Sequence, residues 1–402
     1  MLLHPPFSTF LARGLCRATL QERAKPVHLT YFRDSLPKLD APSAPMLLRP
    51  PEGPVYPPFK RRIPERLFYV VPALMWLVLS VRHGSLTLPS AANPAMDAGG
   101  LWGESKSQGL ELFGPTGQRF LPPFATICCY PGMDRLQEAL AAMDAHSIGF
   151  PVIGKPDRGY QGWGVRLLKS AADLADYLSR QPDDARVMLQ ALIDMPGEAG
   201  IFYIRRPDEH AGRIVSMAFV HPPHVIGDGQ HSVAQLVAAD PILQANAEIY
   251  RDRHPEAWDH VPLPDEFHCL TNARSARLGA VYRDALSEVT TDLEAVIDQI
   301  SQEIPNFQFG RFDIRFRSVA ELRRGRGFRI VELNGAGAEM LHIWAGTGTL
   351  REAWRTLWRQ YRMLFAIGSA MRRKGFKPVG LRGMIRLQRQ QERLRREYPP
   401  SS

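Results

Sequence analysis

The sequence predicts an α+β protein in which neighbouring strands are mostly antiparallel. Two segments, FGRFDIRF (309–316) and FRIVELN (328–334), alternate apolar and polar residues as paired strands do. Elsewhere, short apolar runs end at proline or glycine, and amphipathic stretches that follow a serine indicate capped helices. With 45% hydrophobic and 23% charged residues among 402, the chain has enough apolar material for a sizeable globular core.

Composition divides the chain into four parts. Residues 1–65 are rich in proline and weak in periodicity, which is typical of an arm. Residues 66–100 form a divergent N-terminal segment, and 101–370 hold the α+β unit. Residues 371–402 form a basic tail, because 372–402 hold ten Lys and Arg against two Asp and Glu, a net charge of +8. The whole chain carries +9, so the body is nearly neutral.

One apolar run in the divergent segment has no charged residue. It covers 67–81, contains Pro72, and is flanked by Arg66 and Arg82. A spanning helix needs ~18 residues or more, and this run is shorter. We therefore expect a buried strand–turn–helix piece, with contact to a membrane surface as the alternative.

Periodicity and breakers place the elements of the α+β unit in order. Strands are expected at 151–156, 165–168, 187–193, 201–206, 213–220, 309–316 and 328–334. Helices are expected at 170–178, 232–239, 283–303 and 350–367, the last ending at Gly368.

The charge distribution argues against a nucleic-acid-binding body, for which a basic surface would be expected. The basic tail is either a solvated, partly helical extension or a contact, through 371–397, with an acidic partner or an anionic membrane surface. The four cysteines show no CxxC spacing, so a zinc site is not expected. No secretory signal is evident, and we expect a cytoplasmic protein whose first 30 residues are a disordered arm or, alternatively, a transit peptide.

Lys155 and the glycines that follow it form the first candidate site. The lysine ends an expected strand and precedes a loop with Gly159, Gly162 and Gly164. Glycines let backbone N–H groups approach an anion closely, and a lysine adds positive charge for phosphates. The loop lacks the Gly-Lys-Ser/Thr of a Walker loop, and a plain β-hairpin is the alternative explanation.

A second candidate site lies on the two late strands. Residues two apart in a strand point to the same face, so Glu332 and Asn334 present their oxygen atoms side by side. Asp313 joins them if the two strands pair. Carboxylate and amide oxygens suit Mg²⁺, which binds a few carboxylates together with nucleotide phosphates.

Together these residues resemble the ATP-grasp superfamily over roughly 101–367. GESK, GFPVIGKPDRGYQGWGV, VMLQALIDMPGE, FGRFDIRF and FRIVELN occur in the order of the family's segments. The resemblance implies two α+β subdomains that grip ATP between antiparallel sheets, behind a divergent N-terminal region.

The resemblance also assigns roles to individual residues. It implies phosphate contacts for Lys106 and Lys155, a purine site along Gln190, Ala191, Leu192 and Ile193, and a ribose contact for Glu198. Asn272 lies in TNARSARLG, which resembles a polar loop near the triphosphate or is an ordinary basic loop. Asp313, Glu332 and Asn334 match the magnesium ligands, and Arg311 matches the arginine that steadies an oxyanion in D-alanine–D-alanine ligases.

A local likeness selects the carboxylate–amine ligase branch. HPPHVIGDGQHSVAQLV is similar to a segment of cyanophycin synthetases and related glutamate ligases. The chain departs from that pattern at His221, where those enzymes tend to carry arginine, and at GAGAEMLHIW, where ligases usually have a Pro-Gly turn. Because that turn shapes the acceptor site, the substrates are not carried over from the family.

The resemblance implies formation of an amide or peptide bond through an acyl phosphate. ATP and Mg²⁺, with Mn²⁺ as an alternative metal, would act on a small carboxylic acid and an amine such as an amino acid or peptide. The alternatives are an ATP-grasp kinase or phosphotransferase and a nucleotide-binding scaffold module. The sequence carries no signal for the oligomeric state.

Overall fold

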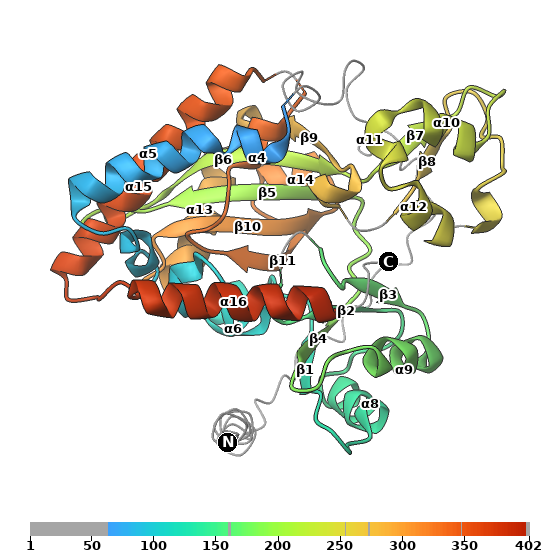
Figure 1. Ribbon diagram of the computed structural model, residues 1–402, viewed down its shortest axis with the longest axis horizontal. Coiled ribbons are helices and arrows are strands. Elements are labelled where there is room, and N and C mark those ends of the chain that lie inside the picture. The colour runs from blue at the N-terminus through green and yellow to red at the C-terminus, as the bar shows by residue number, and fades with distance from the viewer. Residues whose placement is uncertain (1–62, 160–161, 254, 272–273, 347, 399–402) are drawn as a thin grey trace, which may run out of the picture.

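A computed structural model of the chain describes residues 63–398 apart from 160–161, 254, 272–273 and 347 (Figure 1). The fold is α+β with antiparallel sheets, as predicted. The strands are β1 Phe124–Cys128, β2 Val152–Pro156, β3 Arg166–Leu168, β4 Arg186–Ala191, β5 Gly197–Ile204, β6 Arg213–His221, β7 His224–Ile226, β8 Phe267–Cys269, β9 Val281–Asp284, β10 Phe309–Phe316 and β11 Phe328–Asn334.

Helices cover the sheets and fill the connections between them. They are α4 Glu65–Phe68, α5 Val70–His83, α6 Lys106–Glu111, α7 Pro115–Gln118, α8 Arg135–Ala145, α9 Ala171–Ser179, α10 Val233–Ala239, α11 Pro241–Gln244, α12 Ala247–Arg253, α13 Thr291–Glu303, α14 Val319–Arg323, α15 Leu350–Arg373 and α16 Leu381–Glu397. Short 3₁₀ turns include η1 Leu88–Ala91 and η6 Leu341–Trp344.

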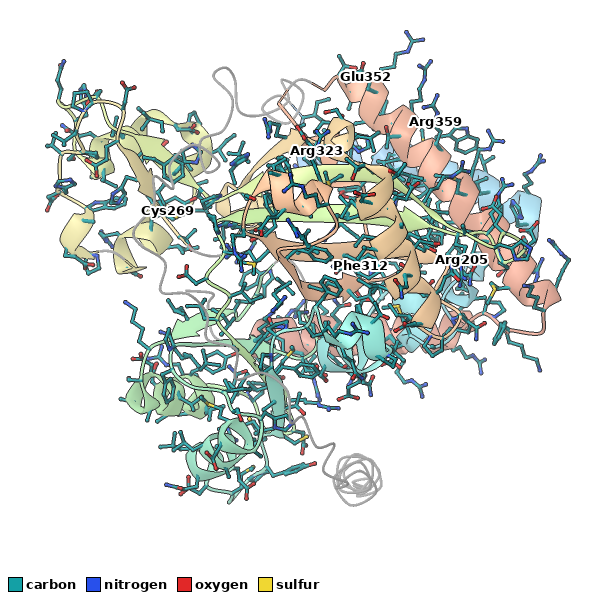
Figure 2. The ribbon with its side chains drawn as sticks, turned by 180° about the vertical axis from the view of Figure 1, so that it is seen from behind. Arg205, Cys269, Phe312, Arg323, Glu352 and Arg359 are labelled. Carbon is teal, nitrogen blue, oxygen red and sulfur yellow. The ribbon has the colours of Figure 1, made fainter. Side chains whose placement is uncertain are left out.

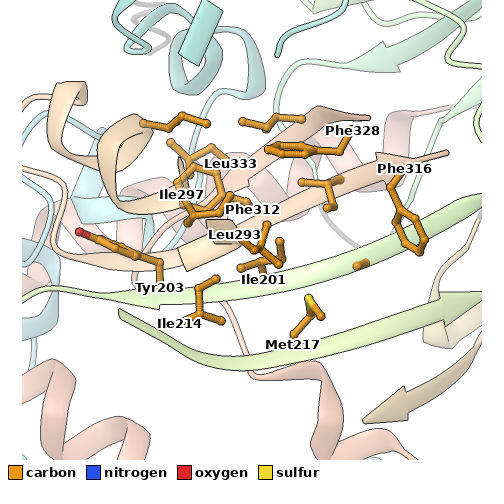
Figure 3. Close-up of a cluster of buried hydrophobic side chains, with 14 of the residues drawn as sticks. Ile201, Tyr203, Ile214, Met217, Leu293, Ile297, Phe312, Phe316, Phe328 and Leu333 are labelled. Carbon is orange, nitrogen blue, oxygen red and sulfur yellow. The ribbon is translucent and has the colours of Figure 1, made fainter. Parts of the chain in front are cut away.

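The larger sheet has the order β11-β10-β5-β6-β9, and every neighbouring pair is antiparallel. One of its faces packs on α13 and α6 in a core that includes Ile201, Phe312 and Leu293 (Figure 3). The opposite face packs on α15 through Phe202 and Leu364. Alternate burial along β10 matches the alternation in its sequence, so Phe312 is in the core while Asp313 is not.

The smaller sheet has the order β1-β4-β2-β3 and carries α8 and α9 on one face. Its core includes Met143, Val152, Leu174 and Leu189. A separate two-stranded sheet, β7-β8, packs with α10, α11 and α12. Residues of both the four-stranded and the five-stranded sheet line one cleft, as the resemblance implied.

The predicted helix at 283–303 is wrong in its first part. Residues Val281–Asp284 are strand β9, which pairs with β6, and the helix begins only at Thr291. The side chain of Thr290 accepts a hydrogen bond from the N–H of Leu293 and so caps the helix. The helix therefore begins at this cap, although the apolar spacing upstream had predicted an earlier start.

The predicted end at Gly368 is also wrong, because α15 continues to Arg373. A Cβ atom at Gly368 would lie 2.7 Å from the carbonyl oxygen of Leu88. The glycine therefore permits close packing of η1 against the helix rather than ending it. One consequence is that the expected boundary at residue 370 falls inside a continuous helix.

The apolar run at 67–81 was predicted as a buried strand–turn–helix piece, and this is wrong. It forms α4 and α5, with Pro72 in the first turn of α5, where its missing N–H leaves no intrahelical bond unmade. Much of the run is solvent-exposed. Within the described residues, one helical segment, Arg66–His83, has the length and apolar composition that could cross a membrane.

The basic tail folds back onto the chain. Its helix α16 buries Met384, Leu394 and the following Tyr398 against the same chain. Leu394 and Tyr398 cluster with Ala185, next to β4. The expectation of a solvated extension therefore holds only for the arginine-rich side of α16, and contact of that side with an external partner stays a prediction.

Candidate active site

The cleft between the two sheets forms a cavity of about 2130 Å³. The smaller sheet contributes Lys155 and Gln190, and the larger sheet contributes Glu198, Asp313 and Glu332. Gln388, Gln391 and Glu392 of α16 line another part of it. Most candidate residues from the sequence therefore meet in one cavity although they are spread over more than 200 positions.

Two lysines lie on the cavity wall. Lys155, at the end of β2, is 6% exposed, and burial lowers its pKa to about 8 despite the nearby Glu332. Lys106 is the first residue of α6, and its Nζ donates to the Gly159 carbonyl at 2.6 Å. The same Nζ lies 3.4 Å from Oε1 of Glu332. Both ammonium groups therefore belong to one buried charge cluster.

Asp157 fixes the start of α6. Its carboxylate accepts hydrogen bonds from the Ser105 hydroxyl at 2.5 Å and from the N–H of Ser107 at 2.9 Å, and its carbonyl accepts from the N–H of Lys106 at 2.9 Å. Asp157 is 1% exposed. This buried anchor couples the position of Lys106 to the loop after β2.

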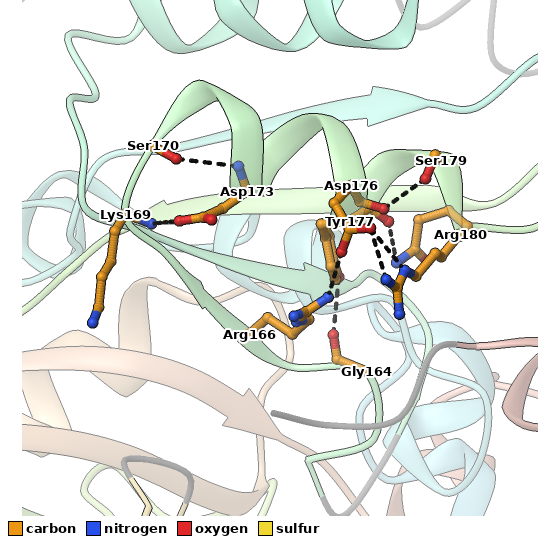
Figure 4. A network of polar contacts seen from close by, with 10 residues as sticks. Gly164, Arg166, Lys169, Ser170, Asp173, Asp176, Tyr177, Ser179 and Arg180 are labelled. Atoms are coloured by element: carbon orange, nitrogen blue, oxygen red, sulfur yellow. Dashed lines mark hydrogen bonds and ion pairs between the residues drawn. The ribbon is translucent and has the colours of Figure 1, made fainter. Parts of the chain in front are cut away.

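The glycine loop is held to α9 rather than lying wholly on the cleft (Figure 4). Gly162 and Gly164 have positive φ angles of 72° and 70°. The Tyr177 hydroxyl donates to the Gly164 carbonyl at 3.0 Å, and a Cβ at Gly164 would clash with Pro156. Gly159 and Gly162 line the cavity whereas Gly164 does not, so Gly164 serves the turn and not the cavity wall.

The acidic side of the cleft is built on the β10–β11 pair. Asp313 stands opposite Glu332, and Arg311 stands opposite Asn334. Nε and Nη2 of Arg311 donate to the two oxygens of Asp313 at 2.6 and 2.9 Å, and Nδ2 of Asn334 donates to Oδ2 of Asp313 at 2.9 Å. Arg311 therefore forms a bidentate ion pair with Asp313.

Positive neighbours decide the charge of Glu332. Burial alone would raise its pKa, but Lys106, Lys155 and Arg311 together lower it, so the carboxylate is ionised at neutral pH. Burial would likewise lower the pKa of Arg311, but the paired Asp313 raises it. Arg311 also donates from Nη1 to the Glu339 carbonyl at 3.0 Å, so its guanidinium is fixed from two sides.

Glu104 is an acidic residue of the site that the sequence did not single out. Its Oε2 accepts from the N–H of Gly335 at 3.2 Å, next to the end of β11. Burial, followed by repulsion from Glu332, raises its pKa to about 8. Glu104 lies two residues before Lys106 in the segment GESK, but that segment predicted a role for the lysine only.

The donor set fits a magnesium ion that also binds phosphate. Glu332, Asp313 and the Asn334 amide supply oxygen atoms on adjacent strands. Along the described chain, no group of three or more His, Cys, Asp or Glu is placed to hold a metal. Two carboxylates and an amide therefore suit Mg²⁺ only together with water and phosphate oxygens.

The expected nucleotide-binding strip covers the last two residues of β4 and the two residues after it. Gln190, Ala191, Leu192 and Ile193 all line the cavity. Nε2 of Gln190 donates to the Val331 carbonyl of β11 at 3.3 Å, so it links the two sheets. Leu192 is 41% exposed, which leaves an apolar side chain available to a flat ring.

Two arginines that the sequence did not assign to the ribose region hold Glu198. Its Oε2 lies 3.0 Å from Nε of Arg315 and 3.5 Å from Nε of Arg274. Burial lowers the pKa of Arg274 to about 10. Arg315 lies two residues after Asp313 on the same face of β10, a period-2 signal that could have found it. Asn272 lies outside the described residues.

Residues of α4, Tyr69 and the segment after β11 also line the cavity. The Tyr69 hydroxyl donates to Oε1 of Glu339 at 2.7 Å, and the indole N–H of Trp344 donates to Oε2 at 3.2 Å. Phe68, Tyr69 and Trp344 all line the cavity. The divergent segment thus contributes to the cleft, at the loop that departs from the ligase pattern.

Several solved structures are similar to this chain. A bifunctional glutathione synthetase from Pasteurella multocida is 18% identical with a TM-score of 0.36, over 63% of this chain and 36% of that one. A D-Ala:D-Ser ligase from Enterococcus faecalis is 14% identical with a TM-score of 0.35, over 66% of this chain and 62% of that one. A D-alanine–D-alanine ligase from Bacillus anthracis is 10% identical with a TM-score of 0.38, over 67% and 68%.

This chain therefore spans about a third of the glutathione synthetase and less than two thirds of the D-Ala:D-Ser ligase. No protein-family model matches the chain, and no curated protein matches it in sequence.

Proposed function

We propose that this chain is an ATP-dependent ligase that joins a carboxylic acid and an amine through an acyl phosphate. One observation carries the proposal. Two lysines and an acidic cluster converge in one cleft between antiparallel sheets, with Nζ of Lys106 3.4 Å from Oε1 of Glu332. Such a set neutralises transferred phosphoryl groups without needing a protein nucleophile.

Lys106 and Lys155 bind the phosphates of ATP in this proposal. Both are held by the fold, Lys106 by the Asp157 anchor and Lys155 by its place on β2. A charge-assisted hydrogen bond contributes about 1.5–3 kcal/mol. Replacing either lysine by alanine should therefore weaken ATP binding at least tenfold, as measured by calorimetry.

Glu332, Asp313 and Asn334 hold magnesium in this proposal. The ion supplies charge neutralisation for the phosphate oxygens when bound. Arg311 keeps Asp313 oriented, since its two donors reach both carboxylate oxygens.

The chemistry proceeds in two balanced steps. A carboxylate oxygen of the acid attacks the γ-phosphorus of ATP, forming an acyl phosphate and releasing ADP. The neutral amine then attacks the acyl carbon, loses a proton, and expels inorganic phosphate to leave an amide. Charge develops on the acyl oxygen in the second step, and a fixed guanidinium such as Arg311 is suited to stabilise it.

The position of Arg311 favours a ligase over a kinase. Three of its five N–H groups bond to Asp313 and to the Glu339 carbonyl. The guanidinium is therefore oriented before substrate binds and has further donors for an oxyanion in the cleft. A kinase would form no tetrahedral carbon and would have no need of that donor.

Product analysis tests the proposal. The protein is incubated with ATP, Mg²⁺ and pairs of amino acids or short peptides, and the products are weighed by mass spectrometry. A product equal to acid plus amine less water, with ADP and phosphate, supports the ligase. A stable phosphorylated substrate would establish a kinase instead, and ATP binding without turnover would favour a scaffold.

Arg311→Lys separates the steps further. We expect it to retain ATP binding but to slow amide formation by roughly 10²–10³, because lysine lacks the planar fork. Arg205→Lys is the matched control, since Arg205 is partly buried directly after β5 but bonds to Phe307 outside the cavity. Equal loss in both variants would mean that Arg311 acts only through stability.

A further inference from the structure

Helix α5 and the preceding α4 present a continuous apolar stripe to solvent. Its six residues are between 50% and 84% exposed: Leu67, Val70, Leu74, Leu77, Val78 and Val81. Their spacing of three and four places them on one side of the helical segment. Contiguous apolar surface of this kind marks an interaction site in most soluble proteins.

The other side of α5 is fixed to the protein body. Trp76 packs edge-on against Tyr361 and Phe365 of α15, and Leu79 is 2% exposed in the same cluster. The His83 ring lies 2.8 Å from the Ser369 hydroxyl. Arg66–His83 is long enough to span a bilayer, but spanning would break these contacts. The stripe can therefore meet apolar material only with α5 lying flat.

The neighbouring helix α15 carries exposed positive charge. Arg351, Arg355, Arg359 and Arg362 of α15 are all exposed. Figure 2 shows Arg359 on this helix at the outer edge of the molecule. The sequence of α5 contains no acidic residue, and that of α15 contains one, Glu352, whose carboxylate is bonded to Thr349.

We propose that α5 and α15 form a docking surface for an anionic lipid bilayer. The stripe enters the boundary between headgroups and acyl chains, and the arginines of α15 contact acidic headgroups. An apolar face beside a basic one is the pattern of helices that lie in the membrane interface. Basic residues near such a surface each strengthen binding about fivefold.

Charge complementarity favours lipid over a second copy of the chain. A two-fold contact through α5 would bring two rows of α15 arginines near each other, with one Glu352 in each row to offset them. Residues 1–62 are also disfavoured as the segment that covers the stripe. They hold ten Lys and Arg against four Asp and Glu, so they carry the same sign of charge as the α15 arginines. An acidic headgroup surface instead supplies both the apolar and the anionic component.

Cosedimentation of the full chain with vesicles tests the proposal. Vesicles of phosphatidylcholine alone are compared with vesicles that also contain phosphatidylglycerol, at low and high salt. We expect binding to the anionic vesicles, weakened by salt because the arginines are exposed. Absence of binding at low ionic strength, or equal binding to both vesicle types, would overturn the proposal.

Paired variants assign the binding to the surface. Leu74→Ser with Leu77→Ser should weaken binding at least tenfold, since buried leucines stabilise insertion. Leu263→Ser with Leu286→Ser is the control, because these leucines are 70% and 45% exposed elsewhere. Thermal unfolding should be nearly unchanged in both, since the side chains are solvent-exposed.

A charge pair completes the test. Arg355→Gln with Arg359→Gln should weaken binding to anionic vesicles by roughly 25-fold. Arg324→Gln with Arg326→Gln, which removes two exposed arginines after α14, is the control and should bind normally. Light scattering decides the remaining alternative. A dimer that the Leu74 and Leu77 double variant converts to a monomer would show that a second copy covers the stripe, and would overturn the proposal.

Discussion

Replacing Glu104 by glutamine should stabilise the protein in a pH-dependent way. The carboxylate lies beside Glu332 and bonds to the N–H of Gly335, and its pKa is raised from an ordinary 4.5 to about 8. A raised carboxyl pKa means that the folded state binds more protons than the unfolded state. Stability therefore falls as pH rises from 4.5 towards 8, by about 1.4 kcal/mol per unit at most.

The magnitude at pH 7 follows from the same shift. At this pH the Glu104 carboxyl is ionised in the unfolded chain but holds its proton in the folded one. The raised pKa therefore lowers the free energy of unfolding by up to about 3 kcal/mol. The Glu104 side chain is only partly shielded from solvent. Screening by water therefore reduces this destabilisation to about 1–3 kcal/mol. Glutamine keeps an acceptor for Gly335 and removes the charge, so the variant should recover most of that free energy.

Thermal unfolding at pH 5, 6, 7 and 8 measures the effect. The midpoint of Glu104→Gln should exceed that of the wild type by a margin that grows with pH, and should rise less on addition of ATP and Mg²⁺. Glu138→Gln on α8 is the control, because Glu138 is exposed and should show no such trend. A constant difference across the four pH values would refute the reasoning about Glu104.

Three further predictions concern the lysine, the acidic cluster and α15. Because the pKa of Lys155 is lowered to about 8, its ammonium loses its proton as pH rises through 8, and ATP affinity measured by calorimetry should fall by up to tenfold per unit above it. Lys155→Arg should remove that dependence, and a wild-type affinity independent of pH would contradict it. Asp313→Asn or Glu332→Gln should abolish Mg²⁺-dependent ATP turnover in an ADP-release assay with the fold intact by circular dichroism; near-normal turnover in either would dismiss the magnesium assignment. Gly368→Ala should lower the thermal midpoint, because a Cβ there would lie 2.7 Å from a backbone oxygen of η1, and an unchanged midpoint would show that η1 can move away.

Local patterns in the sequence predicted much of the framework and part of the site. Period-2 alternation identified β10 and β11 and placed Glu332 and Asn334 on one face, because side-chain direction in a strand depends only on neighbouring residues. The short apolar run that ends at Pro156 located Lys155 at the end of β2. Helix caps such as Ser170 and Ser232 were equally local and were found correctly.

Contacts between distant segments decided the remaining features of the site, namely the charge states and the ion pairs of its side chains. The charge state of Glu104 depends on its burial and on Glu332, which lies more than 200 positions away, and no local pattern predicts either. The arginine partners of Glu198 likewise depend on how distant segments meet in the folded sheet.

The apolar run at 67–81 shows the same division. Its sequence determined a helix-compatible, uncharged segment, but hydrophobicity alone does not say which side of a helix faces a core. The packing of Trp76 and Leu79 on α15 used one side and left Leu74, Leu77 and Val81 in solvent. Burial is a property of the assembled fold, because it depends on which other segments arrive to cover a surface.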